Sequence, residues 1–447
     1  MIRRHLRVAC PAAVLAMTLA ACSSGSSSSA GSETSPAPTA AIPAGGQASP
    51  PPPAASSANS QASPSPAALL GTTPKPATGS AVRIGYMTDG KTTSIDDSSE
   101  VPAAQAAVKY INGYLGGIDG HVLSLDVCDD QQTPSGATDC GNQFVTDKVP
   151  VVLYNASGQG GSVFSVLSAA HIPLVAYDSI DEPTLLAKTG AYVLTNALTA
   201  SFAGPAKIAE LAGATRAADV VIDVPAASGP AKQLDPIIYK NAGVAVDLIA
   251  IPPGTADMTP QIQAELTKNP NQIHIIGDVS FCTSAIKAIK TVGFTKPVVI
   301  IQQCITSTSA ATIPGGYGGL KLVATATTDP TDADVKVYLA AMKLWEPDTP
   351  PFVNGVTAGG WATVLGFVRA MSGLSSDVTP ASVEATISTM SPQPLPFGGA
   401  ITFQCNGQQV SITPAMCSTG ALEATLDQTG DAVGSFTPLD ASALLKL

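Results

Sequence analysis

The sequence predicts an α/β fold of two lobes, each a parallel sheet flanked by helices. First, short apolar strand patterns alternate with helical patterns from residue 82 to about residue 325, which is typical of parallel sheets with crossover helices. Second, residues 80–447 are long for a single core and suit two. Third, the alternation ends near Thr331, where longer helices begin, and an antiparallel hairpin is expected at 397–427.

The stretch at 111–134, INGYLGGIDGHVLSLDVCDDQQTP, shows how each element is recognised. Gly116-Gly117 ends a helix expected at 102–115, because glycine tolerates the left-handed geometry of a helix C-terminus. Residues 121–128 alternate as a strand, and Thr133-Pro134 begins the next helix with Thr as N-cap and Pro in the first position. The other strands are expected at 82–88, 149–154, 172–176, 192–195, 219–224, 244–251, 272–276, 298–301 and 320–325.

The N-terminus has the parts of a secretory signal, with Arg3, Arg4 and Arg7 followed by an apolar run at 8–21. The run is shorter than the ~20 residues of a membrane-spanning helix. It ends in Leu-Ala-Ala-Cys22, which resembles a bacterial lipobox. The resemblance implies a signal peptide at 1–21 and a lipid on Cys22 that anchors the exported protein to the outer face of the cytoplasmic membrane. The alternative is an ordinary signal peptide in which Cys22 is incidental.

Residues 22–79 consist almost entirely of Ser, Ala, Pro, Gly and Thr. Such a segment buries too little apolar area to offset the entropy of ordering it, so we expect a disordered linker between the lipid anchor and the folded part. The formal net charge of the chain is −11, and the sequence has no basic cluster. This balance is unfavourable for a nucleic-acid partner.

Six cysteines follow the linker, an even number that indicates disulfides in an exported domain. Their clustering favours pairs between neighbours, each closing a short loop that contributes roughly 3 kcal/mol in the chain-entropy model. A metal site is the alternative, but no Cys-x-x-Cys pair exists and histidines are few, so we expect no metal. The favoured pairs are Cys128–Cys140, Cys282–Cys304 and Cys405–Cys417.

Asp129 and Asp130 stand where the second strand is expected to end. In open α/β sheets, ligands bind beyond the carboxyl ends of the strands. The alternative is that both aspartates are solvent-exposed loop residues that cap the next helix. The sequence favours this alternative for these two residues.

Several motifs in order carry a resemblance to a known family: VRIGYMTDG, AAVKYINGYLGGIDGHVLSLDVCDDQQTP, VPVVLYNASGQGG, HIPLVAY, IPPGTADMTPQIQAEL and FGGAITFQCNGQQ. From residue 82 to residue 408 the chain resembles the type I periplasmic solute-binding proteins, specifically the branched-chain amino-acid (Leu/Ile/Val) binding family of ABC transporters. The resemblance implies a two-lobed type I periplasmic-binding-protein fold with three crossovers. Lobe 1 is expected at 80–197 and 328–374, and lobe 2 at 198–327 and 375–447.

The resemblance also implies a function. Members of the family bind a small molecule between the lobes, close by hinge motion and present the ligand to ABC permease subunits in the membrane. We therefore expect a lipid-anchored receptor for an amino acid or a related polar solute, with no enzymatic activity and no cofactor. The alternatives are a ligand sensor or a degenerate binding fold that acts through a protein partner. The sequence contains no Gly-x-Ser-x-Gly, His-Glu-x-x-His or P-loop motif that indicates an enzyme.

Candidate ligand-binding residues follow from matching the family's motifs position by position. The family holds a ligand carboxylate with Ser-Ser-Gly after the third strand, and this chain retains Ser157 and Gly158 there. The flanking contacts differ, and the acids Asp178 and Asp278 favour a cationic or polyhydroxylated ligand. The alternative for each of these positions is a solvated loop. The full candidate set is Asp89, Ser157, Gly158, Tyr177, Asp178, Ser179, Ser228 and Asp278.

Overall fold

The structure is a computed structural model that describes residues 66–92, 96–306, 308–351 and 355–446. The predicted signal peptide at 1–21, Cys22 and the predicted linker as far as residue 65 lie outside the described residues. All described elements belong to one compact unit, Ser63–Leu447. Within this described part, no helix combines the length and apolar character needed to cross a membrane.

The first sheet has five parallel strands in the order β2-β1-β3-β4-β5. The inner strands β3 and β4 and the edge strand β5 consist only of buried residues, as expected when helices cover both faces of a parallel sheet. The strands predicted at 82–88, 121–128, 149–154, 172–176 and 192–195 are confirmed, with small shifts at their ends. The observed bounds are β1 Ala81–Thr88, β2 Val122–Asp129, β3 Val152–Tyr154, β4 Leu174–Ala176 and β5 Ala191–Val193.

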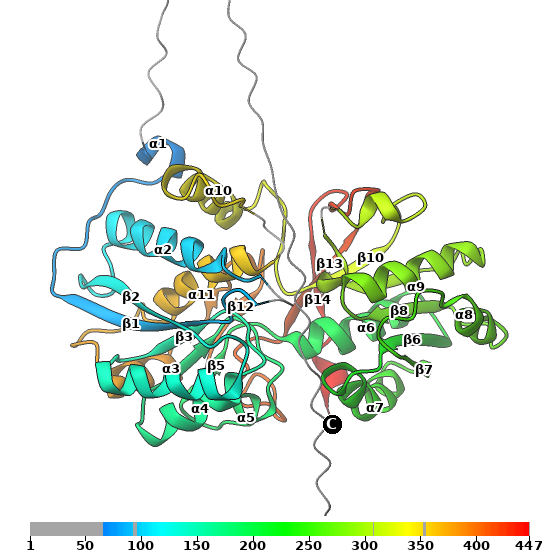
Figure 1. Ribbon diagram of the computed structural model, residues 1–447, viewed down its shortest axis with the longest axis horizontal. Helices are drawn as coiled ribbons and strands as arrows, with labels where there is room; N and C mark the ends of the chain where they lie inside the picture. The colour runs from blue at the N-terminus through cyan, green and yellow to red at the C-terminus, as the bar shows by residue number, and fades with distance from the viewer. Residues whose placement is uncertain (1–65, 93–95, 307, 352–354, 447) are drawn as a thin grey trace, which may run out of the picture. The chain divides into compact units, whose positions relative to one another are not determined.

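Helices cover both faces of this sheet (Figure 1). On one face lie α2 (Glu100–Tyr110), the π-helical turn η1 (Ile111–Leu115) and α11 (Val356–Ala370). On the other face lie α3 (Pro134–Asp147), α4 (Gly160–Ala169) and α5 (Glu182–Leu185). Two further helices, α10 (Ala333–Trp345) and α12 (Pro380–Ser388), contribute buried side chains to the same core.

The two local signals read from residues 111–134 act as predicted. Gly116 and Gly117 have φ values of 85° and 71° and end η1, a geometry that residues with a Cβ atom adopt only with strain. Thr133 caps α3 by accepting a hydrogen bond from the Gly136 amide at 2.9 Å, with Pro134 in the first turn. These signals position β2 and the start of α3, and therefore the loop that contains Asp130.

The second sheet has seven strands in the order β14-β13-β10-β9-β8-β6-β7. Strands β6 to β10 are parallel, whereas β13 is antiparallel to both of its neighbours. Helix α7 packs on one face, and α8 and α9 lie on the other (Figure 1). The bounds are β6 Arg216–Ile222, β7 Ala245–Ile251, β8 Gln272–Ile276, β9 Val298–Ile301, β10 Lys321–Ala324, β13 Gly420–Thr425 and β14 Thr437–Asp440, with η2 Thr199–Ala203, α6 Gly204–Leu211, α7 Pro225–Asn241, α8 Thr259–Leu266 and α9 Val279–Thr291.

The C-terminal region differs from the single hairpin predicted at 397–427. A short hairpin forms between β11 (Gln393–Pro394) and β12 (Thr402–Phe403). The chain then pairs with the edge of the first sheet, where the Cys417 amide donates to the carbonyl of Val193 at 2.8 Å, before β13 enters the second sheet. The hairpin prediction is wrong because an apolar alternation reveals a strand but not its partner. The buried side chains of α12 and β12 share a core with the first sheet, while the exact lobe boundaries stay a prediction.

The end of the predicted linker is ordered, so the expectation of disorder is wrong for residues 66–79, called the strap here. The strap begins with α1 (Pro66–Leu70), in which Leu70 is 2% exposed. Its backbone is held at the end of η1, where the Lys75 and Ala77 amides donate to Gly113 and Asn112 at 3.1 and 2.7 Å. Composition alone did not reveal these contacts, because the partners come from a distant part of the chain.

The six cysteines form the three disulfides that their spacing favours: Cys128–Cys140, Cys282–Cys304 and Cys405–Cys417. The first joins β2 to α3, and the second joins α9 to the turn after β9. The third joins the turn after β12 to the segment that pairs with β5. Each disulfide therefore connects an element to a neighbour in the same part of the fold.

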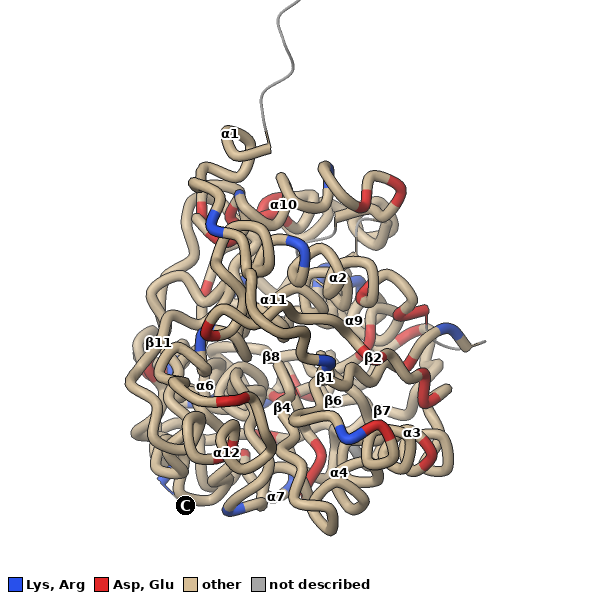
Figure 2. The backbone as a smooth tube through the Cα atoms, turned by 90° about the vertical axis from the view of Figure 1, so that its left-hand side faces the viewer, with Lys and Arg blue, Asp and Glu red and all other residues tan. Residues whose placement is uncertain are grey.

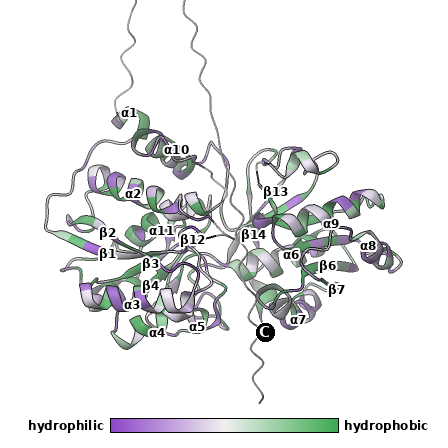
Figure 3. Cartoon of the chain, viewed as in Figure 1, coloured by the Kyte–Doolittle hydropathy of each residue, from purple (hydrophilic) through white to green (hydrophobic). Residues whose placement is uncertain are grey.

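The distribution of apolar and charged residues over the described chain fits the observed fold. The central strands are largely apolar, and the flanking helices mix polar and apolar residues (Figure 3). Asp and Glu outnumber Lys and Arg by 33 to 22. In the tube view, Lys and Arg positions are scattered over several elements (Figure 2). This distribution agrees with the absence of a basic cluster in the sequence.

Candidate functional site

The candidate site lies at the carboxyl ends of three neighbouring strands of the first sheet. Asp89 follows β1, Asp130 follows β2, and Ser157 lies in the loop between β3 and α4. The Ser157 hydroxyl donates to Oδ2 of Asp130 at 3.2 Å and accepts from the Gln159 amide at 3.0 Å. The Asp89 side chain adjoins Ser157 and Asp130, and its Oδ1 is buried without a hydrogen-bond partner among the described residues. Parallel strands end at one edge, so three residues far apart in sequence meet there.

Two more acids extend this group. Asp97 and Glu100 are 8% and 2% exposed, and Asp89 and Asp130 are 7% and 0% exposed. We call these four residues the acidic cluster. Sequence analysis did not single out Asp97 or Glu100, because they belong to the polar loop and first helical turn after β1. The useful signal was a loop rich in acids that leads directly into an apolar helix.

Burial is the largest cause of the pKa shifts in the acidic cluster. It raises the pKa of Asp130 to about 7, of Asp97 to about 6 and of Glu100 to about 8, and it also raises the pKa of Asp89. Neighbouring carboxyls add to each shift, and among the described residues no basic side chain is a main contributor. Buried acids without a cation keep their protons. The acidic cluster therefore holds protons at neutral pH that a cation can displace.

The burial of Asp130 contradicts the interpretation of this aspartate as a solvent-exposed loop residue. Its side chain is fully buried, and its Oδ1 accepts from the Gln132 amide at 2.7 Å while Oδ2 contacts Ser157. Asp129, by contrast, is exposed and accepts from the Gln131 amide at 2.8 Å. The two adjacent aspartates alternate sides as in a strand, so one faces the solvent and the other faces the site.

Ser157 is differently engaged from the carboxylate-holding serine of the resemblance. Its hydroxyl proton points to a carboxyl, and a second carboxyl, Asp89, adjoins it. A ligand carboxylate at this place faces two acids, which is unfavourable unless both are protonated. Gly158 is exposed, with open space around the position of a Cβ atom. The role of both residues in ligand binding stays a prediction.

Of the three candidates after β4, two make hydrogen bonds within the protein and one has an oxygen that is unpaired among the described residues. The Tyr177 hydroxyl donates to the Pro396 carbonyl at 2.8 Å, and Ser179 accepts from the Tyr154 hydroxyl at 3.1 Å. Oδ1 of Asp178 is buried without a hydrogen-bond partner among the described residues, and burial raises the pKa of this carboxyl. Asp178 is therefore the one of these three candidates with a carboxyl oxygen free to accept a further hydrogen bond.

Asp178 also marks where the two sheets approach each other. It lines a cavity of about 20 Å³ together with Gln302, which follows β9, and Thr325, which follows β10. The carboxyl ends of strands from both sheets thus face one small cavity. At this cavity the carboxyl-end edge of the first sheet lies beside that of the second.

The candidates in the second lobe serve the structure of their helices. Ser228 is 4% exposed, and its hydroxyl donates at 3.2 Å to the carbonyl of Val224, the N-cap residue of α7. Asp278 is exposed and caps α9, where it accepts from the Phe281 amide at 2.8 Å. N-capping explains Asp278 without a ligand. A contact of either residue with a ligand stays a prediction.

Asn196 is a residue that sequence analysis missed. It is fully buried in the first connection between the sheets, after β5. Its Nδ2 donates to the Ser418 carbonyl in the connection that enters β13, and its Oδ1 accepts from the Thr199 amide. Nothing in the sequence distinguishes this asparagine, since the partner that gives it a role is more than two hundred residues away.

Comparison with known proteins places this geometry in a family. A family model described as periplasmic binding protein matches residues 81–416. No curated protein sequence matches the chain. Similar solved structures include the branched-chain amino acid transporter substrate-binding protein LivJ from Streptococcus pneumoniae in complex with isoleucine, with 15% identity, 80% of this chain and 100% of that chain covered, and a TM-score of 0.61.

Two further structures show the range of the fold. An ABC transporter substrate-binding protein from Sphaerobacter thermophilus has 15% identity, covers 82% of this chain and 100% of its own, and has a TM-score of 0.67. A solute-binding protein from R. palustris in complex with 4-hydroxybenzoate has 13% identity, covers 80% and 96%, and has a TM-score of 0.60. The expected two-lobed type I fold is confirmed, and the chain belongs to the periplasmic binding protein family.

Proposed function

We propose that the protein is an extracytoplasmic receptor, anchored by a lipid on Cys22, that closes on a small polar solute and delivers it to an ABC permease. Family membership over residues 81–416 supports the receptor function. The observation that carries the proposal is the meeting of polar side chains at the carboxyl ends of β1, β2 and β3, where open α/β sheets bind ligands. Hinge closure brings the second sheet against this edge.

The solute presents a cationic or hydrogen-bond-donating group to the first lobe. Asp89 and Asp130 adjoin Ser157, and the Ser157 hydroxyl is already directed to Asp130. A carboxylate at this place meets like charges, whereas an ammonium, guanidinium or amide N–H group meets acceptors. Such a ligand lowers the pKa of the acids it contacts and releases protons. Its affinity therefore rises as the pH increases through about 7, where Asp130 titrates.

A second function uses the same fold without transport. A ligand sensor, or a degenerate binding fold, acts through a protein partner and needs no permease. Uptake of the identified solute separates these functions: loss of the gene abolishes uptake if the protein delivers solute to a permease and leaves uptake unchanged if it only signals. A Cys22→Ala variant tests the anchor, because an unlipidated receptor leaves the membrane fraction.

Thermal unfolding against a panel of solutes tests the receptor function. The exported chain carrying Cys22→Ser is mixed with polyamines, cationic and neutral amino acids, amides, sugars and short carboxylates. A ligand at 100 times its Kd stabilises a protein by about 2.7 kcal/mol, a shift of several degrees. We expect shifts from amines, guanidines or amides, and none from carboxylates. No shift across the panel favours the degenerate fold.

Two variants test the site itself. Asp130→Asn removes a buried acceptor charge beside Ser157, and we expect the ligand-induced shift to fall by at least half. Asp278→Asn is the matched control, because it changes the same chemical group at an exposed helix cap. Equal shifts in both variants contradict a ligand at the acidic cluster, and a loss only in Asp278→Asn moves the ligand contact to the second lobe.

A further inference from the structure

The core of the second lobe contains four titratable residues that the proposed receptor function does not use. Asp219 lies on β6, His274 on β8, and Asp235 and Tyr239 on α7. Their exposed fractions are 0% for Asp219, His274 and Tyr239 and 1% for Asp235. We call these four residues the α7 cluster. Buried ionisable groups are costly unless they are paired or neutral, so their grouping requires an explanation.

The fold brings the four side chains together from three elements. Asp219 and His274 are direct partners in the parallel pairing of β6 with β8. Oδ1 of Asp219 lies 2.9 Å from Nδ1 of His274, although the two groups are not aligned as a hydrogen bond. Asp235 and Tyr239 are four residues apart on α7 and therefore share a face of that helix. The carboxyls of Asp219 and Asp235 interact with each other, and Asp235 also interacts with His274.

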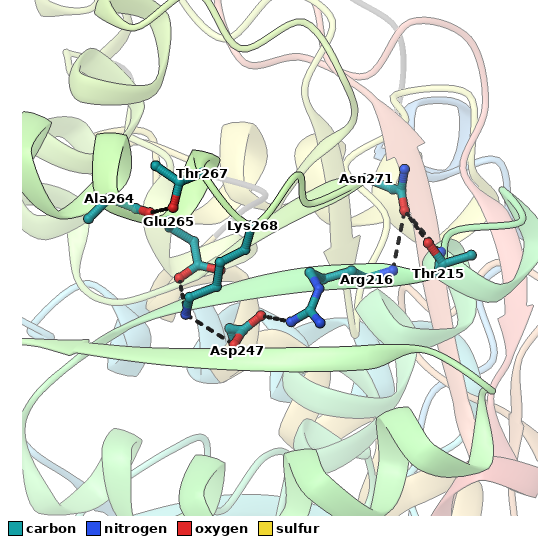
Figure 4. A network of polar contacts seen from close by, with 8 residues as sticks. All are labelled: Thr215, Arg216, Asp247, Ala264, Glu265, Thr267, Lys268 and Asn271. Carbon is teal, nitrogen blue, oxygen red and sulfur yellow. Dashed lines mark hydrogen bonds and ion pairs between the residues drawn. The ribbon is translucent and has the colours of Figure 1, made fainter.

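Among the described residues that pack around it, no fixed charge balances this cluster. Helix α7 contacts β6, β7, η2 and η5 (Ser442–Leu445). Neither η2 nor η5 contains a charged residue, and the one charged residue of β7 is Asp247. Asp247 is engaged with Arg216 and Lys268 in a separate, partly exposed network that also includes Glu265 (Figure 4). The charge of the α7 cluster is therefore set by its own protons.

We propose that the α7 cluster is a pH-dependent latch, which seats α7 on the second sheet while the cluster is neutral and loosens α7 when the cluster becomes an anion. The geometry supports this because α7 supplies two of the four groups and the sheet supplies the other two. Among the described residues of this cluster, only the His274 imidazole could pair with a negative charge that forms there, and burial lowers its pKa to about 4, so it stays neutral at neutral pH. Loosening of α7 exposes the charge to water, which is the favourable response.

The direction of the pH effect follows from the protons that each state holds. Burial raises the pKa of Asp219 to about 7 and of Asp235 to about 10, so folded protein retains protons that unfolded protein loses near pH 4. Stability from both carboxyls is lost as the pH rises through these values. Burial lowers the pKa of His274 to about 4, which opposes this trend between about pH 4 and 6.5. The latch therefore loosens above neutral pH.

The ligand edge of the second lobe is coupled to this latch. Helix α7 begins at Pro225, directly after β6, and carries the predicted ligand contact Ser228 in its first turn. We expect solute affinity to fall when α7 loosens. This consequence rests on the proposed function, whereas loosening itself does not. Hydrogen exchange without any solute tests the latch alone, so failure of the receptor function and failure of the latch are distinguishable.

The first experiment is hydrogen exchange of the exported chain at pH 6 and pH 9. Protection of α7 is expressed relative to α9, on the opposite face of the same sheet, after correction for the intrinsic pH dependence of exchange. We expect the relative protection of α7 to fall at least tenfold at pH 9. An unchanged ratio overturns the proposal, and this test needs no variant.

Three variants provide the second experiment, in which thermal unfolding is followed from pH 6 to pH 9. Asp235→Asn removes one titrating group, so its Tm relative to wild type is expected to rise by about 2 °C per pH unit. Tyr239→Phe keeps both carboxyls and should retain the wild-type pH dependence. Asp223→Asn removes the same formal charge from an exposed residue directly after β6 and should give a constant difference. A constant difference for Asp235→Asn overturns the latch.

Discussion

Asn196 joins two connections between the sheets through Ser418, whose carbonyl accepts a hydrogen bond from its Nδ2 at 2.9 Å. Oδ1 of the same side chain accepts from the Thr199 amide at 2.8 Å, and Asn196 is fully buried. One side chain therefore satisfies backbone groups on both the first connection and the connection into β13. Asn196 therefore links the two connections to each other directly.

Asn196→Ala should lower the free energy of unfolding by about 2–4 kcal/mol, because it leaves a buried amide and a buried carbonyl without partners. Urea unfolding measures the loss. Asn241→Ala is the control, since Asn241 also donates to backbone carbonyls, those of Leu444 and Lys446, from an exposed position. Losses of similar size in both variants contradict a special role for Asn196.

Glu100 makes the stability of the first lobe depend on pH between about 4 and 8. Burial raises its pKa to about 8, so the folded protein keeps a proton that the unfolded protein loses near pH 4. This contribution to stability is lost as the pH rises through about 8. Relative to wild type, Glu100→Gln should gain about 1.4 kcal/mol per pH unit between pH 5 and pH 8. Urea midpoints at each pH measure the gain, and the exposed Glu182→Gln should show none.

The strap depends on Leu70, which is buried beside α10. Leu70→Ala removes most of that apolar contact, so we expect the strap to open more often and limited proteolysis within 66–79 to accelerate about tenfold or more. The neighbouring Leu69 is 38% exposed, and Leu69→Ala is a control that changes the same side chain one position earlier. Equal cleavage rates in the two variants show that Leu70 does not hold the strap.

The Cys282–Cys304 disulfide closes a loop with a sequence separation of 22. Replacing both cysteines with alanine should cost roughly 3 kcal/mol, because the unfolded chain regains the freedom that the disulfide removes. Chemical denaturation compares this variant with wild type under oxidising and reducing conditions. A reductant has no Cys282–Cys304 bond to break in the variant. An unfolding free energy of the variant equal to that of oxidised wild type contradicts the prediction.

Local chemistry made most of the fold predictable. Gly116-Gly117 and Thr133-Pro134 act through the backbone within a few residues, so their geometry needs no distant partner. The apolar strand runs are read in the same way, because both faces of a parallel sheet are covered. The disulfide pairs also followed from local spacing. The pairing of segments that are distant in the sequence is harder to predict from local patterns. The predicted hairpin at 397–427 was wrong for that reason.

The candidate site shows the same division. Asp89 and Ser157 were named from motifs, and the sheet brings them together with Asp130. The burial of Asp130 was not readable from two adjacent aspartates, because the sequence does not show which of them faces inward. Asp97 and Glu100 were missed, since an acid in a loop looks the same whether solvent or a second acid adjoins it.

The sequence by itself determined the alternation of strands and helices, the turns between them and the local pairs of cysteines, because these depend on the chemistry of neighbouring residues. Tertiary structure alone decided which acids are buried and gather in one place, as in the acidic cluster and the α7 cluster. Solvation and charge pairing depend on groups that lie close in space. Parallel sheets bring such groups together from strands that are separated by whole helices.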